Sequence, residues 1–231
     1  MRPAANLKLF ALVALLAAAG SANAALTVYT DSASFLVALS APGVDSFDDL
    51  PLEADIDDPL ARAAGGYAYS AASFGGAAGL VGVGTPDDVW LSTRDSFADL
   101  MLSGIPPGVR AVGGYFFATL ESGAPALGPT LGVDVKVTVT ANTASATASE
   151  SVTKLLVNPT TTSFVGFVST DPFTSFQVSA GGNNTDFVTA NGLTMGTVTA
   201  VPEPQTWALF LAGAGLMVVA RRRGSIGGAR G

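Results

Sequence analysis

The densest group of side chains that could do chemistry is an acidic run early in the chain. Seven carboxylates fall within the fourteen positions 45–58, and no Lys or Arg lies among them. Such crowding is costly unless water solvates the groups or a cation neutralises them, and Ca²⁺ takes about six to eight oxygen ligands. Two interpretations stay open, a solvated acidic loop and a Ca²⁺ site. The candidate Ca²⁺ ligands are Asp45, Asp55, Asp57 and Asp58.

Three aromatic side chains could form a platform for sugar rings. Tyr67 and Tyr69 lie on one face if residues 66–70 are extended, because successive side chains of a strand alternate between its faces. Trp90 is the third candidate. Aromatic faces suit the C–H surfaces of sugars. The alternative is that these rings belong to a hydrophobic core, where most large aromatic side chains lie.

Catalytic chemistry is limited by composition, since the chain contains no His and no Cys. This excludes imidazole bases, Ser-His-Asp and Cys-His nucleophiles, His or Cys zinc sites and disulfides. A pair of carboxylates could still hydrolyse glycosides. However, Glu121 and Glu150 lie in polar segments, not in the apolar setting typical of a general acid. We therefore expect a protein that is not an enzyme, with a secreted glycan hydrolase as an alternative.

The distribution of charge excludes another class of function. The net charge of the chain is -7, but residues 25–200 hold 17 of the 18 acidic residues and only five of the 11 basic ones. Nucleic-acid binding depends mainly on Lys and Arg that neutralise phosphates. We expect no nucleic-acid partner, whereas cations and neutral polymers stay open.

The elements that must position these residues are mostly strands. Valines alternate with polar residues over 133–140, and a second alternating run over 145–153 predicts a hairpin. Asp31 is a predicted cap of one helix over 32–39, and 41–66 reads as an irregular loop. Many short strands between Gly, Pro and Asn turns predict an all-β fold, an antiparallel sandwich over 25–200. The other expected strands cover 26–30, 80–83, 99–102, 111–119, 164–169, 173–179, 186–190 and 193–199.

The first 24 residues have the pattern of a secretory signal peptide. Two basic residues precede an apolar run over 9–19, and Ala22 and Ala24 are the small residues at the -3 and -1 positions of a cleavage site. The apolar run is short compared with the roughly 20 residues that span a bilayer. We therefore expect a signal helix that is removed on export rather than a permanent anchor.

The last segment, 201–231, combines a short motif with a weak membrane span. Residues 207–220 carry no charge and begin with Trp207, an aromatic residue suited to the membrane interface. A helix of this length reaches roughly 21 Å, which is short for a hydrocarbon core of ~30 Å. A basic tail over 221–231 follows and starts with Arg221, Arg222 and Arg223. These arginines favour the cytoplasmic side, so the acidic domain is expected outside.

Pro202, Glu203 and Pro204, followed by this span and the arginine cluster, resemble the PEP-CTERM sorting signal of Gram-negative bacteria. The resemblance implies that exosortase, a membrane-embedded protease, cuts near the motif and passes the protein to the cell surface. The inner membrane would hold the chain only transiently. The three motif residues are then a recognition site in a substrate. A protein that stays permanently anchored in the inner membrane, as an adhesion domain, is the alternative.

The central segment also resembles the jelly-roll-like extracellular domains that often precede such a tail. The resemblance is carried by residues 109–117, 164–169 and 171–176. Jelly rolls include lectins and carbohydrate-binding modules, so it favours sugar binding without naming a site. From this we expect an exported protein of the envelope or extracellular matrix that binds or organises exopolysaccharide in biofilm.

Overall fold

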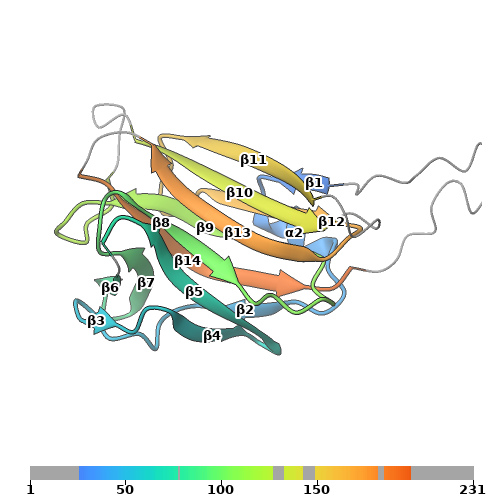
Figure 1. Cartoon of the computed structure of the whole chain (residues 1–231), viewed down its shortest axis with the longest axis horizontal. Coiled ribbons are helices and arrows are strands. Elements are labelled where there is room, and N and C mark those ends of the chain that lie inside the picture. Colours follow the sequence, from blue (N-terminus) through green and yellow to red (C-terminus); the bar gives the residue numbers. More distant parts are fainter. Residues whose placement is uncertain (1–25, 78, 127–132, 143–148, 182–184, 199–231) are drawn as a thin grey trace, which may run out of the picture. The chain divides into compact units, whose positions relative to one another are not determined.

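The computed structural model describes residues 26–198 except positions 78, 127–132, 143–148 and 182–184. These residues fall within one compact unit, Asn23–Thr199. Two antiparallel sheets and one short helix make up the unit (Figure 1), which confirms the expected all-β sandwich. The predicted signal peptide, sorting motif and membrane span lie outside the described residues. Within the described part, no helix has the length and apolar character needed to cross a membrane.

The first sheet, sheet A, contains eight strands. Its order is β1-β12-β9-β14-β7-β6-β3, and β2 pairs with the second half of β14. The strands are β1 Leu26–Tyr29, β2 Gly43–Asp45, β3 Asp55–Ile56, β6 Leu80–Thr85, β7 Asp88–Thr93, β9 Ala111–Thr119, β12 Phe164–Ser169 and β14 Phe187–Gly196. β14 therefore has partners on both sides along most of its length: β9 on one side, and β7 and then β2 on the other.

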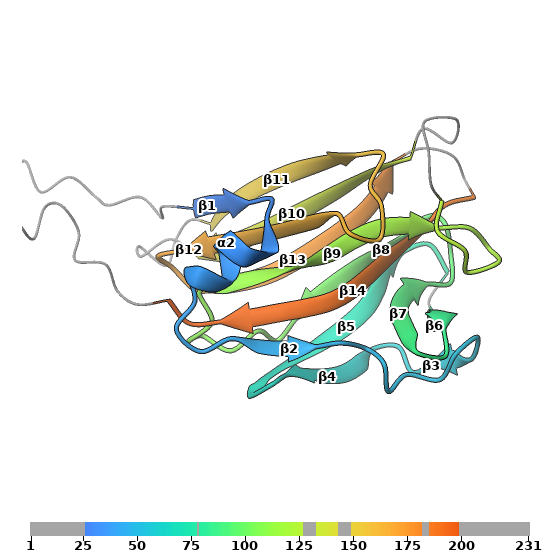
Figure 2. The same cartoon turned by 180° about the vertical axis from the view of Figure 1, so that it is seen from behind.

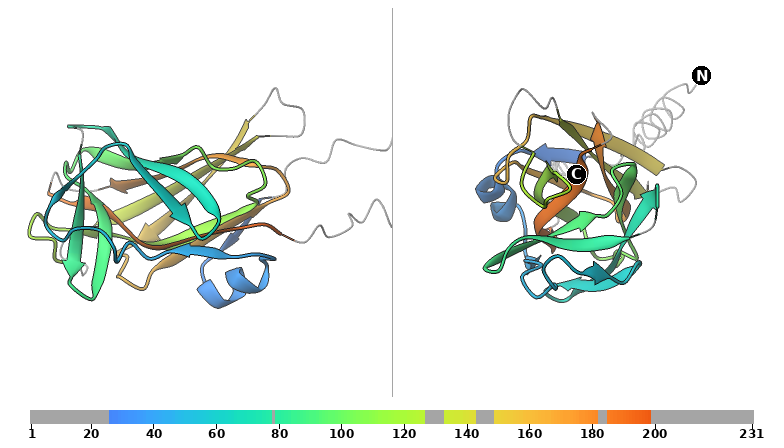
Figure 3. Two further views of the ribbon diagram at one scale, coloured as in Figure 1. Left: turned by 90° about the horizontal axis from the view of Figure 1, so that it is seen from below. Right: turned by 90° about the vertical axis from the view of Figure 1, so that its left-hand side faces the viewer.

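The second sheet, sheet B, contains six strands in the order β11-β10-β13-β8-β5-β4. The strands are β4 Leu60–Ala64, β5 Tyr67–Gly75, β8 Ala98–Ser103, β10 Asp134–Asn142, β11 Ser149–Val157 and β13 Phe173–Gly181. Figure 3 shows the two sheets in two further views. The pair β10 and β11 is the predicted hairpin, with Val137 opposite Lys154 and Thr138 opposite Thr153.

The main core lies between the two sheets. On β10, Val135, Val137 and Val139 are fully buried while Lys136 is exposed, as the alternation of the sequence predicts. Phe176 of β13 joins the layers, because its ring centroid lies 5.3 Å from that of Phe116 on β9. Burial of the aliphatic and aromatic side chains of this core stabilises a domain that has no disulfide.

The helix α2, Ser32–Val37, covers the outer face of sheet A (Figure 2). Asp31 caps it as predicted, since Asp31 Oδ2 accepts a hydrogen bond of 2.7 Å from the backbone N–H of Ser34. Phe35 is fully buried and packs over Gly166 of β12, where a Cβ atom would lie only 2.5 Å from the Phe35 ring. Gly166 therefore leaves the space that the Phe35 ring needs to pack against the sheet.

Two expectations about strands are wrong. The segment 41–66 is not an irregular loop, because it contains β2, β3 and β4. The two strands expected at 186–190 and 193–199 are one strand, β14, with a register shift between Asn191 and Thr194. The shift absorbs the Asn-Gly dipeptide, which otherwise favours a hairpin turn.

Candidate functional site: a polar cavity on the outer face of sheet A

Asp45, the first predicted Ca²⁺ ligand, is a buried partner of an arginine. It is 4% exposed, and Arg62 Nε donates to its Oδ2 at 2.9 Å while Arg62 Nη2 pairs with its Oδ1. The Tyr69 hydroxyl donates to the same Oδ2 at 2.7 Å. The Asp45-Arg62-Tyr69 network therefore ties β2 of sheet A to β4 and β5 of sheet B.

Arg62 also binds Asp49, with Nη1 and Nη2 donating at 2.8 and 2.7 Å. This bidentate pair holds the pKa of Asp49 below its ordinary value, first through hydrogen bonding and then through charge. Hydrogen bonds to Asp45 and Asp49 raise the pKa of Arg62. Burial, followed by the charge of Asp45, raises the pKa of the Tyr69 hydroxyl. All these shifts fit a structural network that stays ionised at Arg62 and neutral at Tyr69.

The remaining predicted Ca²⁺ ligands do not gather around Asp45. Asp55 forms an ion pair with Arg94, whereas Asp58 accepts hydrogen bonds from the backbone N–H groups of Ser73 and Gly79. Asp57 is exposed. Across the described residues, no group of three or more acidic side chains could hold a metal ion. The expected Ca²⁺ site is not formed, because three of its four carboxylates are already occupied by protein donors.

The expected sugar platform is not formed either. Tyr69 and Trp90 are only 4% and 6% exposed, and they belong to different hydrophobic clusters. Trp90 packs edge-on against Phe117, with ring centroids 5.0 Å apart. Tyr67 is partly buried, and its hydroxyl donates to the carbonyl of Ala41 at 2.8 Å. These rings are core and packing residues, so neither Tyr69 nor Trp90 presents a free face to a ligand.

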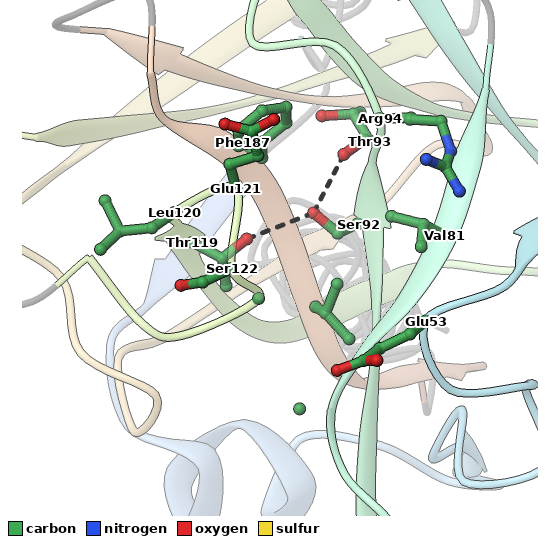
Figure 4. A pocket seen from close by; sticks show the side chains of 13 residues that line it. Glu53, Val81, Ser92, Thr93, Arg94, Thr119, Leu120, Glu121, Ser122 and Phe187 are labelled. Atoms are coloured by element: carbon green, nitrogen blue, oxygen red, sulfur yellow. Dashed lines mark hydrogen bonds between the residues drawn. The ribbon is translucent and has the colours of Figure 1, made fainter.

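A cavity of about 430 Å³ on the outer face of sheet A is a better candidate site. This volume lies in the range of about 300–1,000 Å³ found for small-molecule sites. It is bounded by β6, β7, the end of β9, the start of β14 and the turn after β9 (Figure 4). Its lining includes Glu53, Val81, Val83, Ser92, Thr93, Arg94, Thr119, Glu121, Ser122 and Phe187.

Hydroxyl groups form one wall of the cavity. Ser92 Oγ lies 3.4 Å from Thr119 Oγ1 and donates to the carbonyl of Val188 at 3.1 Å. Both hydroxyl-bearing residues are buried, on neighbours of β14. Thr93 also lines the cavity and is 1% exposed, and its hydroxyl has no hydrogen-bond partner among the described residues. Buried polar atoms usually have partners, so the Thr93 hydroxyl is an exception. Because Ser92, Thr93 and Thr119 are at most 1% exposed, this wall is polar but lies below the accessible surface of the cavity.

Carboxylates and a guanidinium occupy the rim of the cavity. Glu53 and Glu121 are exposed, and neither carboxylate has a protein partner within the described part of the chain. Glu53 has a left-handed backbone (φ 55°), which is uncommon for a residue with a side chain, and its N–H donates to the carbonyl of Gly82 at 2.7 Å. Arg94 is held by its ion pair with Asp55. The rim thus offers acceptors beside an anchored donor.

Sequence reasoning missed both the Arg62 network and the cavity. One signal for the network was available, since Arg62 is the only basic residue between positions 25 and 93 and faces a large excess of carboxylates. No comparable signal marked the cavity. Glu53, Ser92 and Glu121 are far apart in sequence, and only the pairing of β6, β7, β9 and β14 brings their segments together.

Comparison with known proteins bears on the other end of the chain. Residues 200–223 match the family model described as the PEP-CTERM protein-sorting motif. The chain carries a PEP-CTERM sorting signal. The matched range contains the Pro202-Glu203-Pro204 motif, the apolar segment 207–220 and the three arginines. No curated protein matches the chain.

The PEP-CTERM signal shows the route that the protein takes. A chain with this signal is exported, is held transiently at the membrane and is processed by exosortase on its way toward the cell surface. The match ends at the sorting segment and does not extend over the β-sandwich. The sandwich is therefore the part of the chain that this route delivers toward the cell surface.

Proposed function

We propose that this PEP-CTERM protein delivers a non-enzymatic, jelly-roll-like β-sandwich to the envelope or extracellular matrix of a Gram-negative bacterium, where it binds exopolysaccharide. The observation that carries the proposal is the sorting signal at 200–223 behind a compact all-β domain. The acidic surface of this domain supports a neutral polymer as partner, because it would repel phosphate-rich polymers. The cavity on sheet A supplies the polar side chains that such binding needs.

The experiment that tests the sorting step is the intact mass of the protein recovered from the cell surface. Processing by exosortase predicts a form that lacks the residues after the Pro202-Glu203-Pro204 motif. Recovery of a chain that still contains Arg221–Arg223 and requires detergent would favour the permanently anchored adhesion domain instead. The two results differ by the mass of the span and basic tail.

Binding and catalysis are separated by incubation with the exopolysaccharide of the producing strain. Retention of the protein on the immobilised polymer, with no change in the polymer's chain length, is the expected result. Shortening of the polymer would favour the alternative, a hydrolase that uses a pair of carboxylates. Absence of retention would overturn the binding role.

A further inference from the structure

We infer that the cavity on the outer face of sheet A binds one uncharged sugar residue of the exopolysaccharide. The carboxylates of Glu53 and Glu121 accept hydrogen bonds from the hydroxyl groups of this sugar. The inference rests on the proposed polysaccharide-binding function and assigns it a site. In the view of Figure 4, Ser92 and Thr119 lie between Glu53 and Glu121. A ligand in the cavity would therefore meet polar groups on more than one side.

The chemistry of the lining favours a sugar over an apolar ligand. The exposed carboxylates of Glu53 and Glu121 can accept hydrogen bonds from a ligand, and the exposed hydroxyl of Ser122 can donate or accept one. Carboxylates form strong, charge-assisted hydrogen bonds with hydroxyl donors. An apolar molecule would leave these groups without partners, at a cost for each.

The same lining has an apolar part that fits the C–H surface of a sugar ring. Val81 and Val83 project from β6, and Phe187 begins β14. Aromatic rings and aliphatic side chains pack against the less polar surface of a pyranose, while the carboxylates take its hydroxyl groups. A site with this combination favours a sugar over a lipid.

The charge of the rim argues for an uncharged sugar. Glu53 and Glu121 bring two negative charges, and the single guanidinium, Arg94, is already paired with Asp55. An anionic ligand such as a uronate or a phosphate would be repelled by the two carboxylates. The occupant is therefore a neutral sugar unit rather than an acidic one.

The test uses the full chain purified in detergent and compares the double variant Glu53→Gln/Glu121→Gln with the unmodified protein. The probes are the exopolysaccharide of the producing strain, free glucose, galactose and mannose, and a polyuronate. A matched control, Asp57→Asn/Asp87→Asn, changes the charge by the same amount at exposed residues outside the cavity. Because all four side chains are exposed, every variant is expected to fold, and circular dichroism checks this.

The expected result is binding of the polysaccharide or of a neutral hexose that becomes at least tenfold weaker in the glutamine variant, a difference of about 1.4 kcal/mol, and is unchanged in the control. Ser122→Trp, which fills the rim of the cavity, is expected to weaken binding similarly. Unchanged binding in the glutamine and tryptophan variants would overturn the cavity assignment but leave the proposed function intact. Preference for the polyuronate would overturn the neutral-sugar assignment. Absence of binding to every probe would overturn both.

Discussion

Arg62 is the side chain on which the early acidic segment most depends. It neutralises Asp45, which is buried, and Asp49, which is exposed. Replacement Arg62→Met would leave the Asp45 carboxylate buried beside Tyr69 without its cation, and an unpaired buried charge is strongly destabilising. We predict a loss of about 3 kcal/mol in the free energy of unfolding, measured by urea denaturation.

Lys136→Met is the matched control for Arg62→Met, because Lys136 is exposed on β10 and its replacement removes the same charge. We expect it to change the unfolding midpoint little. Adding Asp45→Asn to Arg62→Met removes the uncompensated charge and should restore part of the lost stability. An Arg62→Met protein as stable as the control would show that the Asp45-Arg62-Tyr69 network does not hold the two sheets together.

The pair between Arg62 and Asp49 predicts a dependence of stability on pH. Because Arg62 holds the pKa of folded Asp49 below the ordinary value of 3.8, the unfolded chain takes up this proton first as the pH falls. The contribution of Asp49 is fully present above about pH 4 and is lost as the pH falls through the pKa of the folded state. We therefore predict that the difference in urea midpoint between the unmodified protein and Asp49→Asn is present at pH 7 and shrinks at pH 3. A difference that grows on acidification would contradict this.

Among the elements, the packing of helix α2 depends on two glycines of sheet A that have no side chain beneath it. Gly166 of β12 lies under the Phe35 ring, and a Cβ atom added at its neighbour on β9, Gly113, would lie 3.1 Å from the same ring. Gly166→Ala would place a methyl group 2.5 Å from the ring, so the helix or the ring must shift. We predict a loss of about 1–3 kcal/mol, measured by thermal or urea unfolding.

Gly66→Ala provides the comparison for Gly166→Ala, since no atom lies within 4 Å of a Cβ atom added at Gly66. It is expected to leave stability nearly unchanged. Combining Gly166→Ala with Phe35→Leu, which removes the ring, should cost less than the sum of the two single replacements. If the losses in unfolding free energy of the two single replacements simply add, the Phe35 ring does not pack against Gly166.

The elements that the sequence predicted well are those with strong periodicity or an evident cap. The alternating valines of β10 and the Asp31 cap of α2 are local signals, and both were confirmed. Strands β2, β3 and β4 were missed because they are short and rich in Ala, Asp and Gly, so alternation is hard to see. Strands β5 and β7 were also not among the expected strands. The cavity could not be predicted, because its walls come from strands that are neighbours only through long-range pairing.

For the whole molecule, the sorting signal predicts that a substitution at Glu203 changes how much of the chain is processed. Glu203 is the only acidic residue of the matched segment 200–223, and it lies between two prolines of the motif. We predict that Glu203→Gln leaves more of the chain unprocessed in the membrane fraction, measured by the ratio of full-length to surface form. Gln205→Ala is the control just beyond the motif. Equal processing of both variants would argue against recognition of the carboxylate.

The register of sheet A has a mechanical consequence. Leu26 pairs with Ser169 at the end of β12, and Ala111 pairs with Gly196, so β1 begins and β14 ends at the same end of the sheet. Phe187 and Thr119 place the cavity at the other end. A pull between the cavity and the chain that follows β14 is therefore directed along the strand, across all of its transverse hydrogen bonds at once. A strand loaded in this shear geometry resists rupture better than a strand that is peeled from one end, where the bonds break one at a time.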